Sequence, residues 1–299
     1  MIEFRSLEKR FGRNHALRGI SMTVRDHEIM GLAGMNGAGK TTMIRVAAGL
    51  TIPDSGDVMV DGHSILHERR MALRSTAWVP EVSNMDPMDS PWILFNEFGS
   101  MFGYSRDHIR SKSDECMKQV SLNNVMRKSF SSFSNGMKKR FLIALSLFQN
   151  ARNYLFDETF ASIDPVGSAL LKEIILNLRD QGFSILLSSH ILSELQDISD
   201  RVSIINSGKL TGTFNPEEMS GSVMTLRSRS NPAIVTGILS RYGSVAKDGH
   251  VYTVRGDNIT GIREQIMKSV GESGIEVISI SFGTERLQDI FLRSMESDE

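Results

Sequence analysis

Short apolar runs, separated by polar and glycine-containing segments, recur through the first two thirds of the chain. They lie at residues 28–33, 77–79, 154–156, 183–187 and 202–205. Runs of this length bounded by turn residues predict buried strands. Helical periodicity follows several of them, and strands alternating with helices are typical of a parallel sheet covered on both faces. The pattern therefore predicts an α/β core.

Helical and β-rich segments interrupt this alternation. Residues 2–7 and 19–24 read as short β segments around a turn, and residues 58–60 as another short strand. From residue 82 the sequence pattern changes, and helical stretches follow at 92–102 and 107–120. These stretches predict a helical insertion between strands of the main sheet.

The chain changes character again after residue 215. Within residues 216–299 the predicted strands are 223–226, 244–246, 251–254 and 276–280, and the predicted helices are 232–242, 260–270 and 285–295. This order predicts a small, separate α+β domain. No catalytic set of residues is evident in it.

Residues 34–42, GMNGAGKTT, form a phosphate loop between a predicted strand and a helix starting near Lys40. They fit G-x-x-x-x-G-K-[ST]. Glycines let backbone N–H groups turn toward a phosphate, the lysine reaches the β- and γ-phosphates, and the Thr41 hydroxyl binds Mg²⁺. The helix adds the positive end of its dipole. The predicted binding residues are Asn36, Gly37, Ala38, Gly39, Lys40, Thr41 and Thr42.

Acidic residues and a histidine end two later strands. Asp157 and Glu158 follow the run at 154–156, and His190 follows the run at 183–187. Downstream of a phosphate loop, such an aspartate holds Mg²⁺ through water and such a glutamate polarises the attacking water. A histidine there can hydrogen-bond a γ-phosphate. Without the loop, a strand-end turn and a helix cap would explain these residues.

Other residues have ordinary structural explanations when each is taken alone. Phe11 can stack on adenine, but an isolated aromatic residue is more often part of the core. Ser134 is a predicted helix N-cap, and the basic residues 138–140 after it predict a solvated helix face. His63 and His67 have the spacing of a helical metal pair, but without a third ligand a solvated helix face is favoured.

Composition narrows the possible classes of protein. The 299 residues, 40% hydrophobic and 23% charged, are typical of a globular chain with room for two domains. A net charge of -1 makes general nucleic-acid binding a poor expectation. The single cysteine, Cys116, fits a reducing compartment. Signal-peptide features and membrane-length apolar runs are absent, so we expect a soluble, cytoplasmic chain.

Taken in order, these motifs resemble the ATP-binding cassette of ABC transporters over residues 1–215. The A-loop aromatic corresponds to Phe11, the Q-loop position to Glu81, and the signature motif to residues 133–137, FSNGM. The Walker B motif ends at Asp157, followed by the catalytic glutamate, the D-loop at residues 161–164 and the switch histidine. The resemblance implies a P-loop NTPase fold: a RecA-like core with an antiparallel β subdomain and a helical subdomain at about residues 82–150.

Residues 216–299 resemble the accessory domain that follows the cassette in exporter ATPases of the daunorubicin-resistance type. The sequence ERLQDIF at residues 285–291 resembles the usual tail of that domain. This is a looser likeness than that of the cassette, and export rather than import rests on it.

The resemblance also implies the cofactors ATP and Mg²⁺ and assigns roles to residues. The catalytic residues are Lys40, Glu158 and His190, and the metal-binding residues are Thr41, Glu81 and Asp157. Phe11 and the phosphate loop bind ATP, while Ser134 and Gly136 contact the γ-phosphate held by another subunit.

The implied function is an ATP-hydrolysing subunit that energises substrate movement by separate integral-membrane permease subunits. Two copies, or one copy and a homologous cassette, would sandwich two ATP molecules at the inner face of the cell membrane. No nucleic acid partner is expected. The sequence does not identify the transported substrate, and it leaves homodimer and heterodimer open.

Four departures from the family pattern bear on this function. Glu81 replaces the usual glutamine, Asn135 and Met137 replace a glycine and a glutamine of the signature motif, and residues 159–160 replace the usual Pro-Thr. Two alternatives remain open: a soluble ABC ATPase of DNA repair or translation, and a weakly hydrolysing ATP-dependent regulator. The first would need a coiled coil or a second cassette, and the sequence shows neither.

Overall fold

The computed structural model describes residues 1–82, 85–161, 163–216, 222–256, 259, 261–284 and 291. It divides the chain into two compact units, Met1–Thr213 and Phe214–Glu299, each described here by itself. The predicted boundary after residue 215 lies close to this division. Within the described residues, no helix combines the length and the apolar character that crossing a membrane requires.

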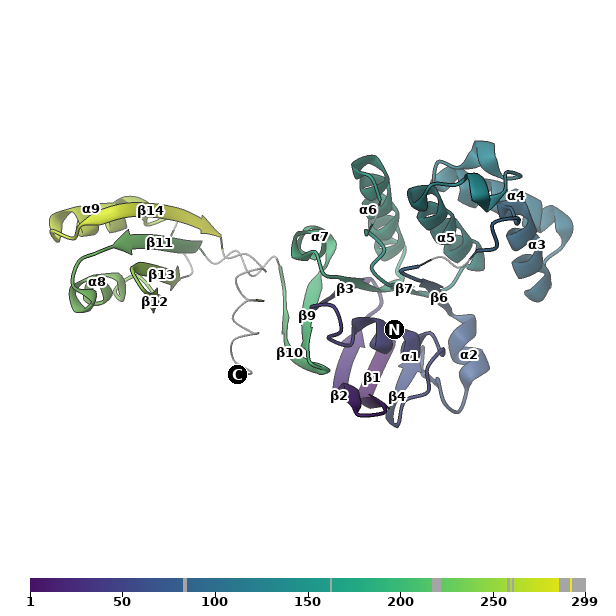
Figure 1. Ribbon diagram of the computed structural model, residues 1–299, viewed down its shortest axis with the longest axis horizontal. Coiled ribbons are helices and arrows are strands. Elements are labelled where there is room, and N and C mark those ends of the chain that lie inside the picture. The colour runs from purple at the N-terminus through teal and green to yellow at the C-terminus, as the bar shows by residue number, and fades with distance from the viewer. Residues whose placement is uncertain are drawn as a thin grey trace. The chain divides into compact units, whose positions relative to one another are not determined.

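A six-stranded sheet in the order β10-β9-β3-β8-β7-β6 forms the centre of the first unit (Figure 1). Its strands are β3 (Glu28–Ala33), β6 (Thr76–Val79), β7 (Asn153–Phe156), β8 (Ser184–Ser189), β9 (Arg201–Asn206) and β10 (Lys209–Phe214). β3 pairs in parallel with β8 and β9, and β7 pairs in parallel with β6 and β8. Every residue of β3, β7 and β8 is buried, as expected of parallel strands with helices on both faces. The predicted α/β class is confirmed.

The register of this sheet decides where the chain's functional residues meet. Ala33 pairs with Ser189, and Phe156 pairs with Leu187, so β3, β7 and β8 end at the same edge. The segments that follow these strands lead into α1 (Lys40–Ala47), α6 (Pro165–Asp180) and α7 (Leu192–Ile198). The carboxyl edge of a parallel sheet is where ligands bind in such folds.

A four-stranded antiparallel sheet in the order β2-β1-β4-β5 covers α1. Its strands are β1 (Ile2–Phe11), β2 (Asn14–Val24), β4 (Ser55–Val60) and β5 (His63–Ser64). The predicted short β segments are therefore wrong in length, because β1 and β2 form one long hairpin. Register shifts along β1, with Ser6 at φ 47°, interrupt the alternation that the sequence pattern relies on.

The predicted helical insertion is present as α3 (Pro91–Met101), α4 (Arg106–Gln119) and α5 (Asn135–Gln149). Figure 1 shows these three helices grouped together beside the central sheet. Their shared core is aromatic: the Phe95 ring lies 5.5 Å from that of Phe141 and 5.0 Å from that of Phe148, centroid to centroid. Such pairs add about 0.5–1.5 kcal/mol each beyond their burial.

The helix predicted around His63 and His67 is wrong. His63 lies in β5, residues 65–68 form a turn, and α2 (Arg69–Arg74) begins only at Arg69. His63 Nδ1 lies 3.1 Å from Glu68 Oε1, an exposed contact that closes this turn. Two histidines on different local structures do not form the helical metal pair that their spacing suggests.

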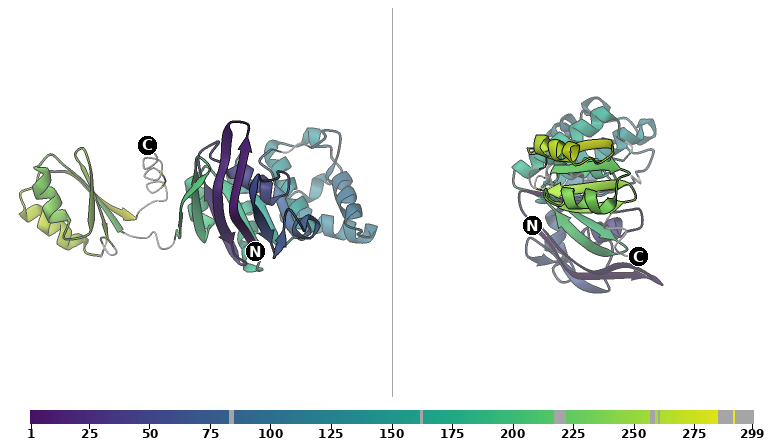
Figure 2. Two further views of the ribbon diagram at one scale, coloured as in Figure 1. Left: turned by 90° about the horizontal axis from the view of Figure 1, so that it is seen from below. Right: turned by 90° about the vertical axis from the view of Figure 1, so that its left-hand side faces the viewer.

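The second unit is a βαββαβ domain with strand order β12-β13-β11-β14. Its elements are β11 (Ser222–Ser228), α8 (Pro232–Leu239), β12 (Ser244–Asp248), β13 (Val251–Gly256), α9 (Arg263–Glu272) and β14 (Val277–Thr284). Both helices lie on one face of the sheet (Figure 2), where Met224, Tyr252 and Ile266 are buried between the two layers. The predicted helix at 285–295, including the ERLQDIF segment, lies almost entirely outside the described residues.

Candidate nucleotide-binding site

The phosphate loop joins β3 to α1 and depends on its glycines for close backbone packing. Gly39 is the N-cap of α1 at φ 117°, and a Cβ there would lie 2.7 Å from the carbonyl oxygen of Ala16. A Cβ on Gly34 would lie 2.6 Å from the carbonyl oxygen of Ile205. Both positions therefore exclude a side chain, and glycine allows the close backbone packing that shapes the loop.

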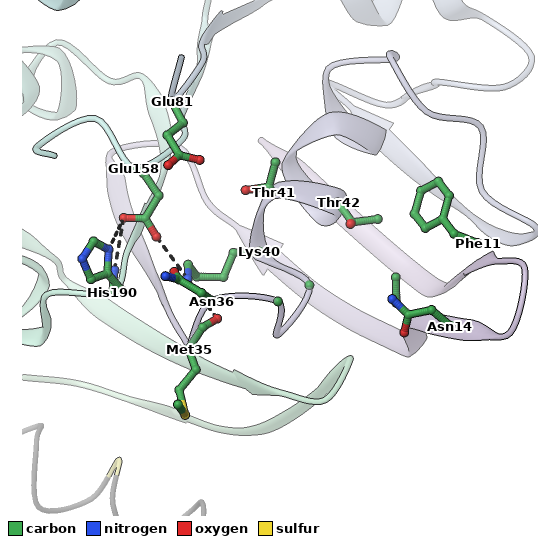
Figure 3. Close-up of a pocket in the computed structure, with 13 residues that line it drawn as sticks. Phe11, Asn14, Met35, Asn36, Lys40, Thr41, Thr42, Glu81, Glu158 and His190 are labelled. Atoms are coloured by element: carbon green, nitrogen blue, oxygen red, sulfur yellow. Dashed lines mark hydrogen bonds and ion pairs between the residues drawn. The ribbon is translucent and has the colours of Figure 1, made fainter. Parts of the chain in front are cut away.

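A pocket of about 360 Å³ opens over this loop. Figure 3 shows Glu158 and His190 at one end of it and Phe11 with Asn14 at the other. The lining residues are Phe11, Asn14, Ala16, Met35, Asn36, Gly37, Gly39, Lys40, Thr41, Thr42, Glu81, Glu158 and His190. Ten of the predicted site residues thus share one cavity, whose volume falls in the range of small-molecule sites.

Lys40 is folded back over the loop and buried to 5% exposure. Its Nζ donates to the carbonyl oxygens of Gly34 at 2.7 Å and Met35 at 3.3 Å. It also lies 3.1 Å from Glu158 Oε1 as an ion pair (Figure 3). A phosphate entering the pocket can take the place of these partners, since an ammonium binds phosphate as a point charge.

Hydroxyl groups from two elements hold the Asp157 carboxylate. Thr41 Oγ1 donates to Asp157 Oδ1 at 3.1 Å, and Ser188 Oγ donates to the same oxygen at 2.9 Å. Ser188 Oγ in turn accepts from the backbone N–H of Glu158 at 3.0 Å. Ser188 is a positioning residue that the sequence did not single out, although it lies in the run that ends at His190.

Glu158 and His190 are joined directly. His190 Nδ1 lies 2.7 Å from Glu158 Oε2, and the backbone N–H of His190 donates to the same oxygen at 3.3 Å. Glu158 has φ 45°, a left-handed conformation uncommon for a residue other than glycine, and its side chain is almost fully buried. A strained backbone at such a site holds the carboxylate in one place at some cost in stability.

Burial and charge move the carboxylates in opposite directions. Burial raises the pKa of Asp157 above its ordinary value and outweighs the hydrogen bonds from Ser188 and Thr41. Burial also acts to raise the pKa of Glu158, but the His190 hydrogen bond and the Lys40 charge together lower it. Glu158 is therefore ionised at neutral pH, as a residue that polarises water must be.

The chemistry of these donors fits Mg²⁺. Burial of Asp157 near Glu81 and Glu158 concentrates negative charge that a divalent cation would neutralise. Within the described residues, no cluster of three His, Cys, Asp or Glu side chains is arranged as metal ligands. Mg²⁺ does not need one, because it commonly uses one or two carboxylates together with water and the phosphates of its substrate.

Phe11 is not the core residue that an isolated aromatic suggests. Its side chain is 52% exposed at the end of β1, and Lys9 Nζ lies 5.4 Å from its ring centroid. Asn14, which the sequence did not indicate, lies beside it in the pocket. An exposed ring at the mouth of a phosphate site offers a flat surface on which a base can stack.

Ser134 and Gly136 are two of the four predicted site residues that do not line this pocket. Ser134 caps α5, as predicted, and its Oγ accepts from the backbone N–H of Met137 at 3.2 Å. Ser134 is exposed and Gly136 half-buried, at the N-terminus of a 15-residue helix. Ala38 and Asp157 also lie outside the lining: Ala38 is a buried residue of the loop, and Asp157 accepts a hydrogen bond from Thr41.

Lys139 contradicts the predicted solvated face. It is 5% exposed, and its Nζ donates to the carbonyl oxygens of Pro80 and Glu81, both at 2.8 Å. Burial lowers the pKa of Lys139 to about 8, against the opposing influence of nearby carboxylates. The helical position of the residue is right, but periodicity alone could not show that another segment covers this turn of α5.

Comparison with known proteins agrees with this geometry. Residues 17–161 match the family model described as ABC transporter. The Nod factor export ATP-binding protein I of Burkholderia lata is 32% identical over 208 residues, which span 70% of this chain and 68% of that protein. The bacitracin transport ATP-binding protein BcrA of Bacillus licheniformis is 29% identical over 313 residues, spanning 98% of this chain and 96% of that protein.

Solved structures share the fold of the first unit. An ATP-binding subunit of an ABC transporter has a TM-score of 0.68 and 23% identity, covering 73% of this chain and 91% of that structure. A dimeric bacterial ABC transporter cassette has a TM-score of 0.67 and 20% identity, covering 72% of this chain and 99% of that structure. At these identities the likeness concerns the fold alone.

Proposed function

The chain belongs to the ABC transporter family as one of its ATP-binding proteins. We propose the following roles for its residues. The protein is an ATPase that energises transport. Lys40 and the loop N–H groups hold the phosphates, and Phe11 stacks on adenine. Glu158 orients and polarises the attacking water, and His190 holds Glu158 and contacts the γ-phosphate. The observation that supports these roles most directly is that Lys40 contacts Glu158, and Glu158 contacts His190, in one pocket.

The metal assignment rests on the oxygen donors at the carboxyl edge of the sheet. Thr41 and Asp157 would hold Mg²⁺, and Glu81, which also lines the pocket, would bind a water of the ion. When bound, Mg²⁺ neutralises charge on the β- and γ-phosphates. For phosphoryl transfer to water, this chain then supplies positioning and charge. Lys40 offsets the negative charge of the triphosphate, and Glu158 accepts a hydrogen bond from the attacking water.

A second cassette completes the site. The N-terminus of α5, with Ser134 and Gly136, is an anion site that faces no phosphate in its own chain. A phosphate held by another copy would satisfy it, and a two-fold dimer would form two such composite sites. One of the structurally similar cassettes is itself dimeric. ATP would hold the two copies together, and hydrolysis would release them.

The remaining partners are integral-membrane permease subunits, which bring the chain to the inner face of the membrane. Export is the direction favoured, because the Nod factor protein is named for export and the daunorubicin resistance protein DrrA3 of Streptomyces coeruleorubidus matches 95% of this chain at 25% identity. The second unit, residues 214–299, is a βαββαβ accessory domain outside the ATPase core. A permease in the complex would select the substrate.

Affinity purification of the tagged full chain from detergent-solubilised membranes tests this function. The expected result is an integral-membrane protein that remains bound through size-exclusion chromatography and raises the ATPase rate several-fold. A control purification of the Lys40→Met variant should still retain that protein, because the interface does not include the pocket. Recovery of the chain without any membrane protein, with full ATPase activity, would favour the soluble ATPase instead.

A further inference from the structure

A buried lysine contacts the main chain of Glu81, a residue that lines the nucleotide pocket, and has no role in the mechanism above. Lys139, in the second turn of α5, gives its hydrogen bonds to two main-chain carbonyl groups, those of Pro80 and Glu81. Within the described residues it forms no ion pair. Burying an ammonium against neutral dipoles alone is costly, so its charge must be balanced by groups further away.

The balancing groups are the acids of the ATP site. The carboxylates of Asp157, Glu81 and Glu158 all interact favourably with the Lys139 charge. Asp157 and Glu158 are themselves buried, and among the described residues the ion pair of Lys40 is with Glu158. Three carboxylates near one pocket repel each other and the triphosphate, and Lys139 is the second buried cation that offsets this repulsion.

Lys139 also holds the main chain that follows β6 in place. Pro80 and Glu81 directly follow β6, whose last residue Val79 pairs with Phe156 of β7. Two hydrogen bonds of 2.8 Å from one ammonium hold consecutive carbonyl groups of this segment. The Glu81 side chain then reaches the pocket beside Glu158, as Figure 3 shows.

We propose that Lys139 is a positioning residue of the ATP site: it fixes the main chain at Pro80–Glu81 and offsets the Glu81 charge, so that a third carboxylate can face the bound triphosphate. The proposal rests on the ATPase function and adds a residue to it. Because Lys139 lies on the helix that Ser134 begins, it also ties the segment offered to a second copy to the Glu81 segment of its own site.

A double-mutant cycle tests the coupling. ATP affinity is measured in EDTA by isothermal titration calorimetry, and kcat is measured in Mg²⁺, for the full-length wild type, Lys139→Gln, Glu81→Gln and the double variant. Lys139→Gln should weaken metal-free ATP binding about fivefold, since the pocket becomes more negative. Adding Glu81→Gln should restore it to within about twofold of wild type. Lys118→Gln, at an exposed position of α4, removes the same charge away from the pocket and should change neither value.

The cycle separates a positioning role from a structural one. Effects of the two substitutions on ATP affinity that simply add, so that Glu81→Gln helps the wild type as much as it helps Lys139→Gln, would overturn the proposal, because a lysine needed only for packing does not change the effect of the Glu81 charge. If Lys139→Gln does not fold, recovery of folded protein in the double variant supports the proposal and its failure to fold overturns it. A wild type that neither binds nor hydrolyses ATP would instead refute the function itself.

Discussion

Replacing Glu158 by glutamine should separate ATP binding from hydrolysis. The substitution keeps the shape of the side chain and removes its charge, while the amide oxygen can still accept from the His190 backbone N–H. A residue that polarises the attacking water contributes about 10²–10⁴ in rate. We therefore expect kcat to fall at least a hundredfold in a steady-state phosphate-release assay.

The same substitution should tighten ATP binding. In the free chain the Glu158 carboxylate holds Lys40 at 3.1 Å, and ATP must break that ion pair to reach the lysine. Removing the competing charge favours the triphosphate, and a gain of ~1.4 kcal/mol would lower Kd about tenfold. Glu173→Gln, an exposed carboxylate of α6, is the matched control and should leave Kd and kcat unchanged.

Stability should respond in a pH-dependent way. The pKa of Glu158 is lowered in the folded chain, so the ionised carboxylate stabilises the fold above its ordinary pKa, and this contribution is lost as pH falls through the lowered value. Glu158→Gln should therefore unfold at a lower temperature than wild type at pH 7, with the difference shrinking below about pH 4. Wild-type turnover in Glu158→Gln, or weaker ATP binding, would refute the reasoning.

Three further predictions concern single positions. Phe11→Ala should raise the Kd for ATP about tenfold by calorimetry, because base stacking on an aromatic ring is worth about 1–3 kcal/mol, and should leave the Kd for inorganic triphosphate unchanged. Because the pKa of Asp157 is raised, the Mg²⁺ affinity of the ADP-bound chain should begin to fall at a higher pH than it would with an ordinary aspartate. Asp157→Asn should bind Mg²⁺ weakly at every pH, and a pH profile unchanged from wild type in this variant would exclude Asp157 as the titrating ligand. Gly39→Ala should abolish ATP binding, since its Cβ would meet the Ala16 carbonyl oxygen, whereas Gly37→Ala, where a Cβ would meet nothing within 4 Å, should bind detectably despite its strained φ.

Residues with a local signal could be predicted from the sequence. The phosphate loop, the strand ends at Asp157 and His190, and the cap at Ser134 each have short-range patterns, and the structure places the first three at one sheet edge. The parallel strands were predictable because burial on both faces leaves continuous apolar runs. The structure describes only part of the 161–164 segment, so the D-loop stays a prediction.

Residues that depend on distant partners could not be predicted. Lys139 is 59 residues from Pro80, and nothing in its own helix indicates that the β6 segment covers it. Ser188 acts through Asp157, 31 residues away. The length of the β1–β2 hairpin was underestimated because register shifts break the two-residue alternation. β10 was missed because its residues alternate between exposed and half-buried positions, so none of them is fully buried.

The claim on which the function depends is that each ATP is bound by Lys40 of one copy and by the α5 N-terminus of another. Mixing two inactive variants tests it directly. Lys40→Met removes the phosphate lysine, and Gly136→Asp places a negative charge where phosphate should bind, at a helix position that favours acidic residues. Each variant alone should be inactive. Mixed dimers contain one site with both intact elements, so ATPase activity should return to roughly a quarter of wild type; no recovery, in mixtures shown to form mixed dimers, would contradict the composite site.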